Sequence, residues 1–105
     1  MSAKDKVLAI LRRHVGARNG IRAAALAHLA AIPERQVRHR ISELREDGVA
    51  VCGHPSTGYY IAQTSEELET CCQFLRSRAM HSLVLESRLR RIPLPDLIGQ
   101  LKLPT

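Results

Sequence analysis

Hydrophobic residues recur at helical spacing along most of the chain, with two short stretches of strand-like composition near its middle. The first helical stretch places Val7, Leu11 and Val15 on one face, and Gly16 follows as a residue that can stop a helix. This pattern predicts a first helix over residues 3–15.

A second and a third helix are predicted on either side of a tight turn. The alanine-rich residues 22–29 favour a helix that other helices can approach closely, with Ala25, Leu26 and Leu29 in the core. The third helix is expected over residues 33–47, with a proline in its first position, where the missing N–H costs little.

The third predicted helix has an apolar face and a basic face. Val37, Ile41 and Leu44 lie at i, i+4 and i+7, so they should face the core, and Gly48 should end the helix in a left-handed conformation. The first two turns of the opposite face carry polar and basic side chains: Arg35, Arg38, His39 and Ser42. Structural or ion-paired roles are expected for two further arginines, Arg40 and Arg45.

Two runs of strand-like composition predict a β-hairpin after the third helix. Residues 49–52 and 59–62 are the strands, and the small or turn-forming residues 53–58 connect them. Ile21 is expected to pair briefly with this hairpin.

The C-terminal part is predicted to form a helical extension. Thr64 and Glu67 have the spacing of a capping box, so a long helix is expected over residues 64–91, before Pro93. A shorter amphipathic segment follows at residues 94–101. One face of the long helix carries an apolar stripe: Leu68, Cys72, Leu75, Ala79 and Leu83. The stripe is expected either to pair with a second copy or to pack on the chain itself after a bend near Ser82.

These elements predict a mainly α protein with a small β-hairpin, organised as a domain at residues 1–63 and a helical extension at residues 64–105. A chain of 105 residues is long enough for one modest core. Aromatic residues make up only 3%, so aliphatic side chains must build that core, which suits helices better than a β-sandwich.

Positive charge is concentrated in the predicted domain. The formal net charge of the chain is +6. Residues 1–63 contain ten basic and five acidic side chains, whereas residues 64–105 contain six and five. The excess therefore coincides with the third predicted helix, as expected for a surface that faces phosphates.

Residues 4–62 resemble the winged helix-turn-helix DNA-binding proteins of bacteria and their phages. The resemblance is carried by residues 24–27, by the Ile-Pro-Glu-Arg-Gln-Val run at 32–37, by residues 41–45, and by the Gly-Tyr-Tyr-Ile run at 58–61. It implies a winged helix-turn-helix with a C-terminal extension, and a small transcriptional regulator that binds double-stranded DNA sequence-specifically. In such proteins the third helix enters the major groove and the hairpin, called the wing, lies on the backbone.

The resemblance also implies which side chains contact DNA. The groove candidates belong to the third helix: Arg35, Gln36, Arg38, His39 and Ser42. Arginine and glutamine can form paired hydrogen bonds with guanine and adenine edges. The phosphate candidates lie in the first turn, at the start of the second helix and at the wing tip: Arg18, Asn19, Arg22, His54, Ser56 and Thr57.

No cofactor, metal or enzymatic activity is expected. No Gly-rich phosphate loop and no Ser/His/Asp arrangement stands out. Cys52, His54, Cys71 and Cys72 lack the paired spacings of a structural zinc site, and the adjacent cysteines suit an apolar helix face better than redox chemistry. The odd cysteine count favours a reducing cytoplasm, and no apolar run is long enough for a membrane helix.

Functions of two classes remain open from the sequence. The first is the DNA-binding regulator, acting as a homodimer because two half-sites raise affinity and specificity. The second is a winged-helix module that binds a protein, such as a phage-encoded inhibitor or adaptor of a host protein. A DNA binder with little sequence preference is a minor third alternative. The basic face of the third predicted helix favours DNA as the partner.

Overall fold

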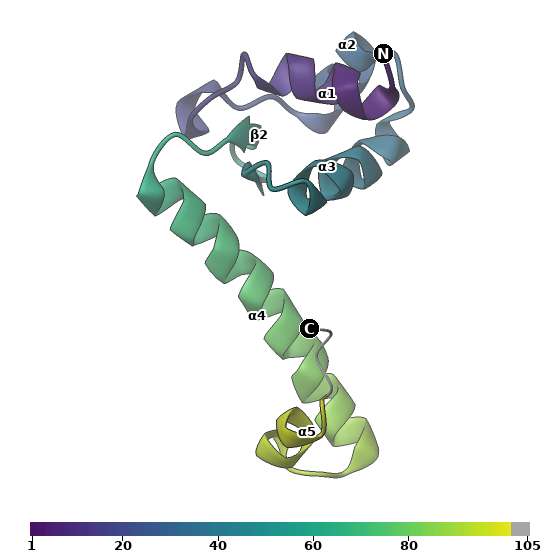
Figure 1. Ribbon diagram of the computed structural model, residues 1–105, viewed down its shortest axis with the longest axis vertical. Coiled ribbons are helices and arrows are strands. Elements are labelled where there is room, and N and C mark those ends of the chain that lie inside the picture. The colour runs from purple at the N-terminus through teal and green to yellow at the C-terminus, as the bar shows by residue number, and fades with distance from the viewer. Residues whose placement is uncertain (102–105) are drawn as a thin grey trace. The chain divides into compact units, whose positions relative to one another are not determined.

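The computed structural model describes residues 1–101 and consists of helices and one antiparallel hairpin (Figure 1). Its elements in chain order are α1 (Ala3–Leu11), the 3-10 turn η1 (Ala17–Asn19), α2 (Ala23–Ala30), the 3-10 turn η2 (Glu34–Gln36), α3 (Val37–Glu46), β1 (Val51–His54), β2 (Gly58–Ile61), α4 (Ser65–Arg90) and α5 (Leu94–Gln100). The chain divides into two compact units, Met1–Cys71 and Cys72–Thr105, and the division falls inside α4. The prediction of a mainly α protein with a small β-hairpin is confirmed.

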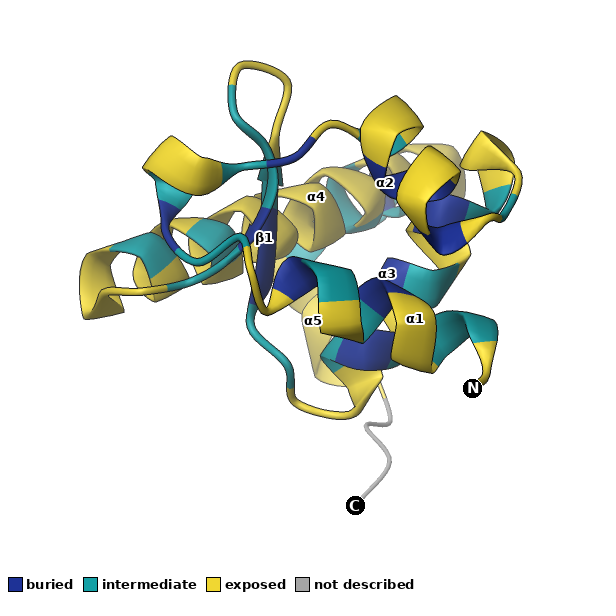
Figure 2. Cartoon of the chain, turned by 90° about the horizontal axis from the view of Figure 1, so that it is seen from above, coloured by how far each residue is buried: buried dark blue, intermediate teal, exposed yellow. Residues whose placement is uncertain are grey.

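Aliphatic side chains from three helices build the core of the first unit. Val7 and Leu11 of α1, Leu26 of α2, and Ile41 and Leu44 of α3 are all at most 1% exposed. Figure 2 shows the buried positions of these helices in dark blue. Each buried leucine or isoleucine stabilises the fold by about 1.5–3 kcal/mol, so the core depends on these few residues.

Helix α3 ends as its sequence predicts. Gly48 has a φ of 88° and donates its N–H to the Arg45 carbonyl at 3.0 Å, and Val49 donates to the Leu44 carbonyl at 2.9 Å. These two bonds form a Schellman motif, which the left-handed glycine makes accessible. Because the Val49 N–H closes the helix, strand β1 begins at Val51 and not at residue 49 as expected.

The hairpin is paired on both sides of β2. Its register places Cys52 opposite Tyr60 and Gly53 opposite Tyr59. On the other side, Ile21 and Tyr59 exchange both backbone hydrogen bonds, at 2.8 and 2.7 Å, which confirms the expected pairing of Ile21. The approach is so close that a Cβ on Gly20 would lie 1.9 Å from the Thr57 carbonyl oxygen, so only glycine fits there.

Two helix boundaries differ from the sequence-based expectation because the chain forms other hydrogen bonds there. Helix α1 ends at Leu11 and not at Val15, because Val15 forms a parallel bridge with Ile61. The third helix begins with the 3-10 turn η2, and Pro33 lies just before that turn in an extended conformation, not in the first helical position.

The prediction that Ala25 and Leu29 are buried was wrong. Both are exposed, and Leu29 is 61% exposed. Helix α2 instead buries Leu26, Ala27 and Ala30. At about 100° per residue these three lie within one narrow sector, and Ala25 and Leu29 fall outside it.

Glu67 joins the first turn of α4 to η1. The Glu67 N–H donates to Thr64 Oγ1 at 3.1 Å, which confirms the N-cap predicted for Thr64. The Glu67 carboxylate accepts hydrogen bonds from the Gln63 N–H at 2.8 Å and from the Ala17 N–H at 2.9 Å. These bonds, the Gln63 bond first, lower the pKa of the Glu67 carboxyl below its ordinary value.

The second unit is a helical hairpin made from the rest of α4 and from α5. Helix α4 is continuous through Ser82 and closes at Arg91, which has a φ of 57°, with the Ile92 N–H bonded to the Ser87 carbonyl at 3.0 Å. Ser87 and Leu97, 7% and 2% exposed, are the buried positions of this hairpin. Helix α5 supplies the amphipathic segment expected after Pro93.

The hydrogen bonds of Glu67 predict a pH-dependent stability. A carboxyl with a lowered pKa contributes stability above its unfolded pKa, and that contribution is lost as the pH falls through the folded pKa. We expect Glu67→Gln to unfold at lower urea concentration than the wild type at pH 7 and to approach the wild type near pH 3. Glu66→Gln, an exposed control in the same turn, should follow the wild type throughout. Equal urea midpoints for all three proteins at pH 7 would contradict this role.

Candidate nucleic-acid interface

The apolar face of α3 is buried, and this determines which side chains of α3 face solvent. Val37 and Ile41 are each 1% exposed. Consequently Arg38, His39 and Ser42 lie on the exposed side of the helix. Two more of the groove candidates precede them in η2, where Arg35 is exposed and Gln36 is half-buried. All five groove candidates therefore belong to one continuous helical segment.

Two of the three acidic residues at the end of α3 form ion pairs within the protein. Glu43 forms an ion pair with Arg40 at 2.7 Å, and Asp47, which caps the helix, pairs with Lys4 of α1 at 2.7 Å. Arg45 donates its Nε–H to the Val51 carbonyl at 2.8 Å. The structural roles expected for Arg40 and Arg45 are confirmed.

Arg35 and Arg38 differ from these residues because neither forms an ion pair within residues 1–101. Both arginines lie at the exposed start of the helical segment, whereas Glu43, Glu46 and Asp47 lie at its end. An exposed guanidinium without an internal partner keeps its charge and its N–H donors available to a ligand. Residues 34–38, at the beginning of this helical segment, contain these two arginines and one acid, Glu34, and so carry a formal charge of +1.

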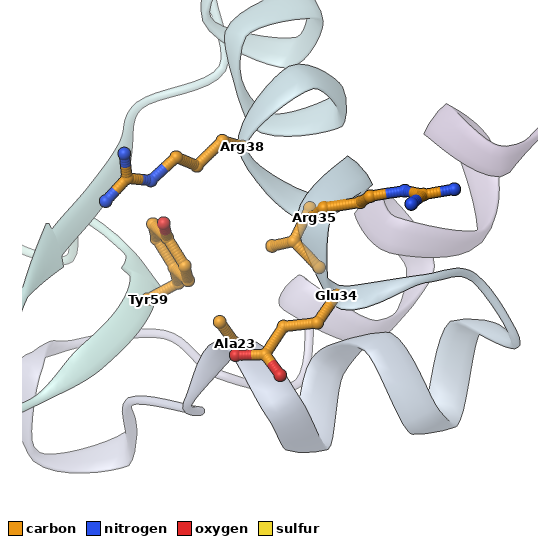
Figure 3. Close-up of a pocket in the computed structure, with 6 residues that line it drawn as sticks. Ala23, Glu34, Arg35, Arg38 and Tyr59 are labelled. Atoms are coloured by element: carbon orange, nitrogen blue, oxygen red, sulfur yellow. The ribbon is translucent and has the colours of Figure 1, made fainter.

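An open depression lies between the start of α3, the start of α2 and strand β2. It has a volume of about 350 Å³ and is lined by Ala23, Glu34, Arg35, Val37, Arg38 and Tyr59. In Figure 3 the Arg38 guanidinium lies near the Tyr59 ring on one side of the depression, and Arg35 points away from them. The depression thus brings one arginine of α3 next to an aromatic side chain of the hairpin.

Tyr59 is a residue of this surface that the sequence analysis treated only as part of a strand. Its ring lies across Gly53 on the paired strand, where an added Cβ would be 2.8 Å from a ring carbon. The sequence prediction had placed Gly53 in the turn between the strands, and the structure places it in β1, opposite Tyr59. A half-buried tyrosine at such a surface offers both a ring face and a hydroxyl.

Arg22 holds the tip of the hairpin. Its guanidinium donates to the Pro55 carbonyl at 2.5 Å and to the Ser56 carbonyl at 3.3 Å. At the tip itself, His54 Nδ1 accepts a hydrogen bond from the Ser56 N–H at 3.1 Å and lies 2.7 Å from Ser56 Oγ. Thr57 Oγ1 donates a hydrogen bond to the Gly58 carbonyl at 3.0 Å. Arg22 and the candidates at the hairpin tip therefore form one hydrogen-bonded group. Within this group, Arg22 holds the backbone of Pro55 and Ser56 in place.

The two candidates in η1 differ in their surroundings. Asn19 donates its side-chain amide to the Val15 carbonyl at 3.0 Å, and its own carbonyl oxygen lies 2.7 Å from His14 Nδ1. Arg18 is exposed. Asn19 thus shapes the turn, whereas Arg18 stands at its surface.

The stripe expected on α4 is largely open to solvent. Leu68 and Leu75 are 44% and 40% exposed, Cys72 and Ala79 are exposed, and Leu83 is half-buried. Most of α4 is accordingly drawn as exposed in Figure 2.

The cysteines near β1 make a protected thiol environment. Cys52 is buried, and Cys71 Sγ lies 3.6 Å from the Val51 carbonyl oxygen. Burial, followed by the neighbouring Cys71, raises the pKa of the Cys52 thiol to about 12. A thiol with so high a pKa stays protonated and is a poor nucleophile. Within residues 1–101 no group of three His, Cys, Asp or Glu side chains is placed to hold a metal ion.

The Arg22 contacts predict a specific local effect. We expect Arg22→Ala to loosen the hairpin tip by about 1 kcal/mol, which corresponds to roughly fivefold faster hydrogen exchange of the Thr57 amide, because that N–H closes the turn on the His54 carbonyl. Arg18→Ala is the matched control and should leave this amide unchanged. Unchanged exchange at Thr57 in the Arg22 variant would show that the tip does not depend on the guanidinium.

Comparison with protein-family models, with curated proteins and with solved structures found no match to this chain. No helix within residues 1–101 is long and apolar enough to cross a membrane.

Proposed function

We propose that the chain is a winged helix-turn-helix protein that binds double-stranded DNA sequence-specifically as a small transcriptional regulator. Helix α3, with η2 at its start, enters the major groove, and the β1–β2 hairpin is the wing that lies on the backbone. The observation that carries the proposal is the pair of arginines at the start of α3: Arg35 and Arg38 are exposed and form no ion pair within residues 1–101.

The order and pairing of the elements support this assignment. Helices α2 and α3 follow each other across a tight turn, and α3 is followed by a hairpin whose second strand pairs with Ile21. The Arg22 contacts hold the hairpin tip, and Tyr59 lies beside Arg38. A groove-reading helix next to a braced hairpin can contact bases and backbone together.

The chemistry of the exposed residues suits base recognition. Arg35 and Arg38 can each donate two parallel hydrogen bonds to a guanine edge, and Gln36 can pair with adenine. His39 and Ser42 continue the same exposed face by one further turn. The phosphate contacts fall to Arg18, to the remaining donors of Arg22, and to the hairpin tip.

We further propose that the protein acts as a homodimer through the stripe on α4. Of the ten large hydrophobic side chains that are exposed within residues 1–101, two belong to the stripe, Leu68 and Leu75, and six more lie elsewhere in residues 68–101: Phe74, Met80, Leu85, Leu89, Ile98 and Leu101. So much exposed apolar surface on one segment is typical of a surface that another protein covers. The same observation favours the second candidate function, a winged-helix module that binds a different protein.

Substitution of the two unpaired arginines tests the DNA assignment. We expect Arg35→Ala and Arg38→Ala each to weaken binding by about 1–3 kcal/mol to a duplex enriched from a random pool, because each loses a paired contact with a base. Binding is measured by fluorescence anisotropy at several salt concentrations.

Arg13→Ala is the charge-matched control, since Arg13 is also exposed but lies in the turn after α1 and not in α3. It should bind within twofold of the wild type. If both α3 variants bind as tightly as the wild type, α3 does not read DNA. If no duplex is enriched at all, the protein-binding function is favoured.

Charges on the α4 stripe test the homodimer. The wild type should sediment at about twice the chain mass of 11.7 kDa at micromolar concentration, and Leu75→Glu with Ala79→Glu should give folded monomers that bind DNA more weakly. Ser77→Glu places a single glutamate on the opposite side of the helix and should stay dimeric. A wild type that sediments as a monomer throughout this range would contradict the assignment.

A further inference from the structure

We propose that two copies of the chain pair through α4 in an antiparallel orientation. The inference rests on the proposed homodimer and adds the direction in which the two helices run. Three features of α4 and α5 support it: the alternation of large and small side chains on the stripe, the charge polarity of α4, and the exposed apolar residues of α5.

The stripe alternates large and small side chains. Leu68, Cys72, Leu75 and Ala79 follow one another at i, i+4, i+7 and i+11, and none of them is buried. Full antiparallel overlap of two copies of α4 sets Cys72 opposite the partner's Leu83 and sets Leu75 next to the partner's Ala79 and Met80. Parallel overlap sets every residue against its own counterpart, leucine against leucine and cysteine against cysteine. Close packing favours the antiparallel arrangement.

Charge changes sign along α4. Residues 65–70 contain three glutamates and no basic side chain. Residues 76–91 contain five arginines and a single acid, Glu86, which pairs with Arg90 at 2.7 Å. This polarity also suits the helix dipole, but only an antiparallel pair brings the acidic start of one helix beside the basic end of the other.

Helix α5 covers part of the C-terminal end of α4, whereas the N-terminal half of α4 keeps exposed leucines. It lies against the last turns of α4, where Ser87 is buried, and it leaves Ile98 and Leu101 44% and 40% exposed. Leu68 and Leu75 are exposed to the same extent in the first half of α4. An antiparallel pair brings the α5 of each copy to the first half of the partner's α4, so these two apolar surfaces cover each other. In a parallel pair they lie at opposite ends.

Disulfide cross-linking tests the orientation without DNA. Cys72 is exposed on the stripe and serves as a native reporter. In the antiparallel pair it faces the partner's residues Ser82 and Leu83, whereas in a parallel pair it faces the partner's Cys72. The wild type, Ser82→Cys, and Ser82→Cys with Cys72→Ala are oxidised with copper phenanthroline, and the bonds are located by peptide mass mapping.

We expect a covalent dimer with a 72–82 bond from Ser82→Cys and none from the other two proteins. A 72–72 bond in the wild type, or an 82–82 bond in the double variant, would overturn the proposal in favour of parallel pairing. A dimer that forms none of these bonds, or a monomer in sedimentation, would also overturn it. Failure to enrich any duplex, with the 72–82 bond present, would instead reject DNA binding and leave the antiparallel pair in place.

Discussion

Burial of Val37, Ile41 and Leu44 is the constraint on which the rest of the first unit depends. These side chains from one face of α3 fill the space between α1 and α2, and each is 1% exposed. Rotation of α3 about its axis would expose all three at a cost of several kcal/mol, so the helix has one stable setting. That setting also determines that Arg38, His39 and Ser42 face solvent. The proposed reading surface is thus a direct product of the core.

The hairpin adds a second constraint through its backbone. Tyr59 exchanges two hydrogen bonds with Ile21 and pairs across the hairpin with Gly53, so β2 is held between two other segments of chain. The Glu67 carboxylate then links the residues just after β2 to η1. The turn η1 and the residues before α4 are far apart in the sequence. They lie next to each other because an N–H group from each donates a hydrogen bond to the Glu67 carboxylate.

The sequence predicted most of the elements because their signals are local. Apolar spacing located α1, α3 and α4, Gly48 marked the end of α3, and Thr64 marked the start of α4. What the sequence did not predict depends on contacts between distant residues. The early end of α1 follows from the bridge between Val15 and Ile61, and the buried side of α2 follows from how that short helix packs.

The candidate site was predictable to a similar degree. The outward positions on α3 follow from periodicity alone, and so do the structural roles of Arg40 and Arg45. Two features could not be read from spacing. The contacts of Arg22 with the hairpin tip span more than thirty residues of sequence, and Tyr59 reaches the Arg38 depression only because Gly53 stands opposite it.

The bond from Arg45 to the Val51 carbonyl has a consequence for how the protein behaves at high concentration. An edge strand with free carbonyls is a template on which another chain can add a strand and start aggregation. On β1 the Val51 carbonyl is occupied by the Arg45 guanidinium and approached by Cys71, and on β2 the far edge is occupied by Ile21. These contacts leave fewer backbone groups of the hairpin open to a strand from another chain, which lowers the tendency of this hairpin to extend into a larger sheet.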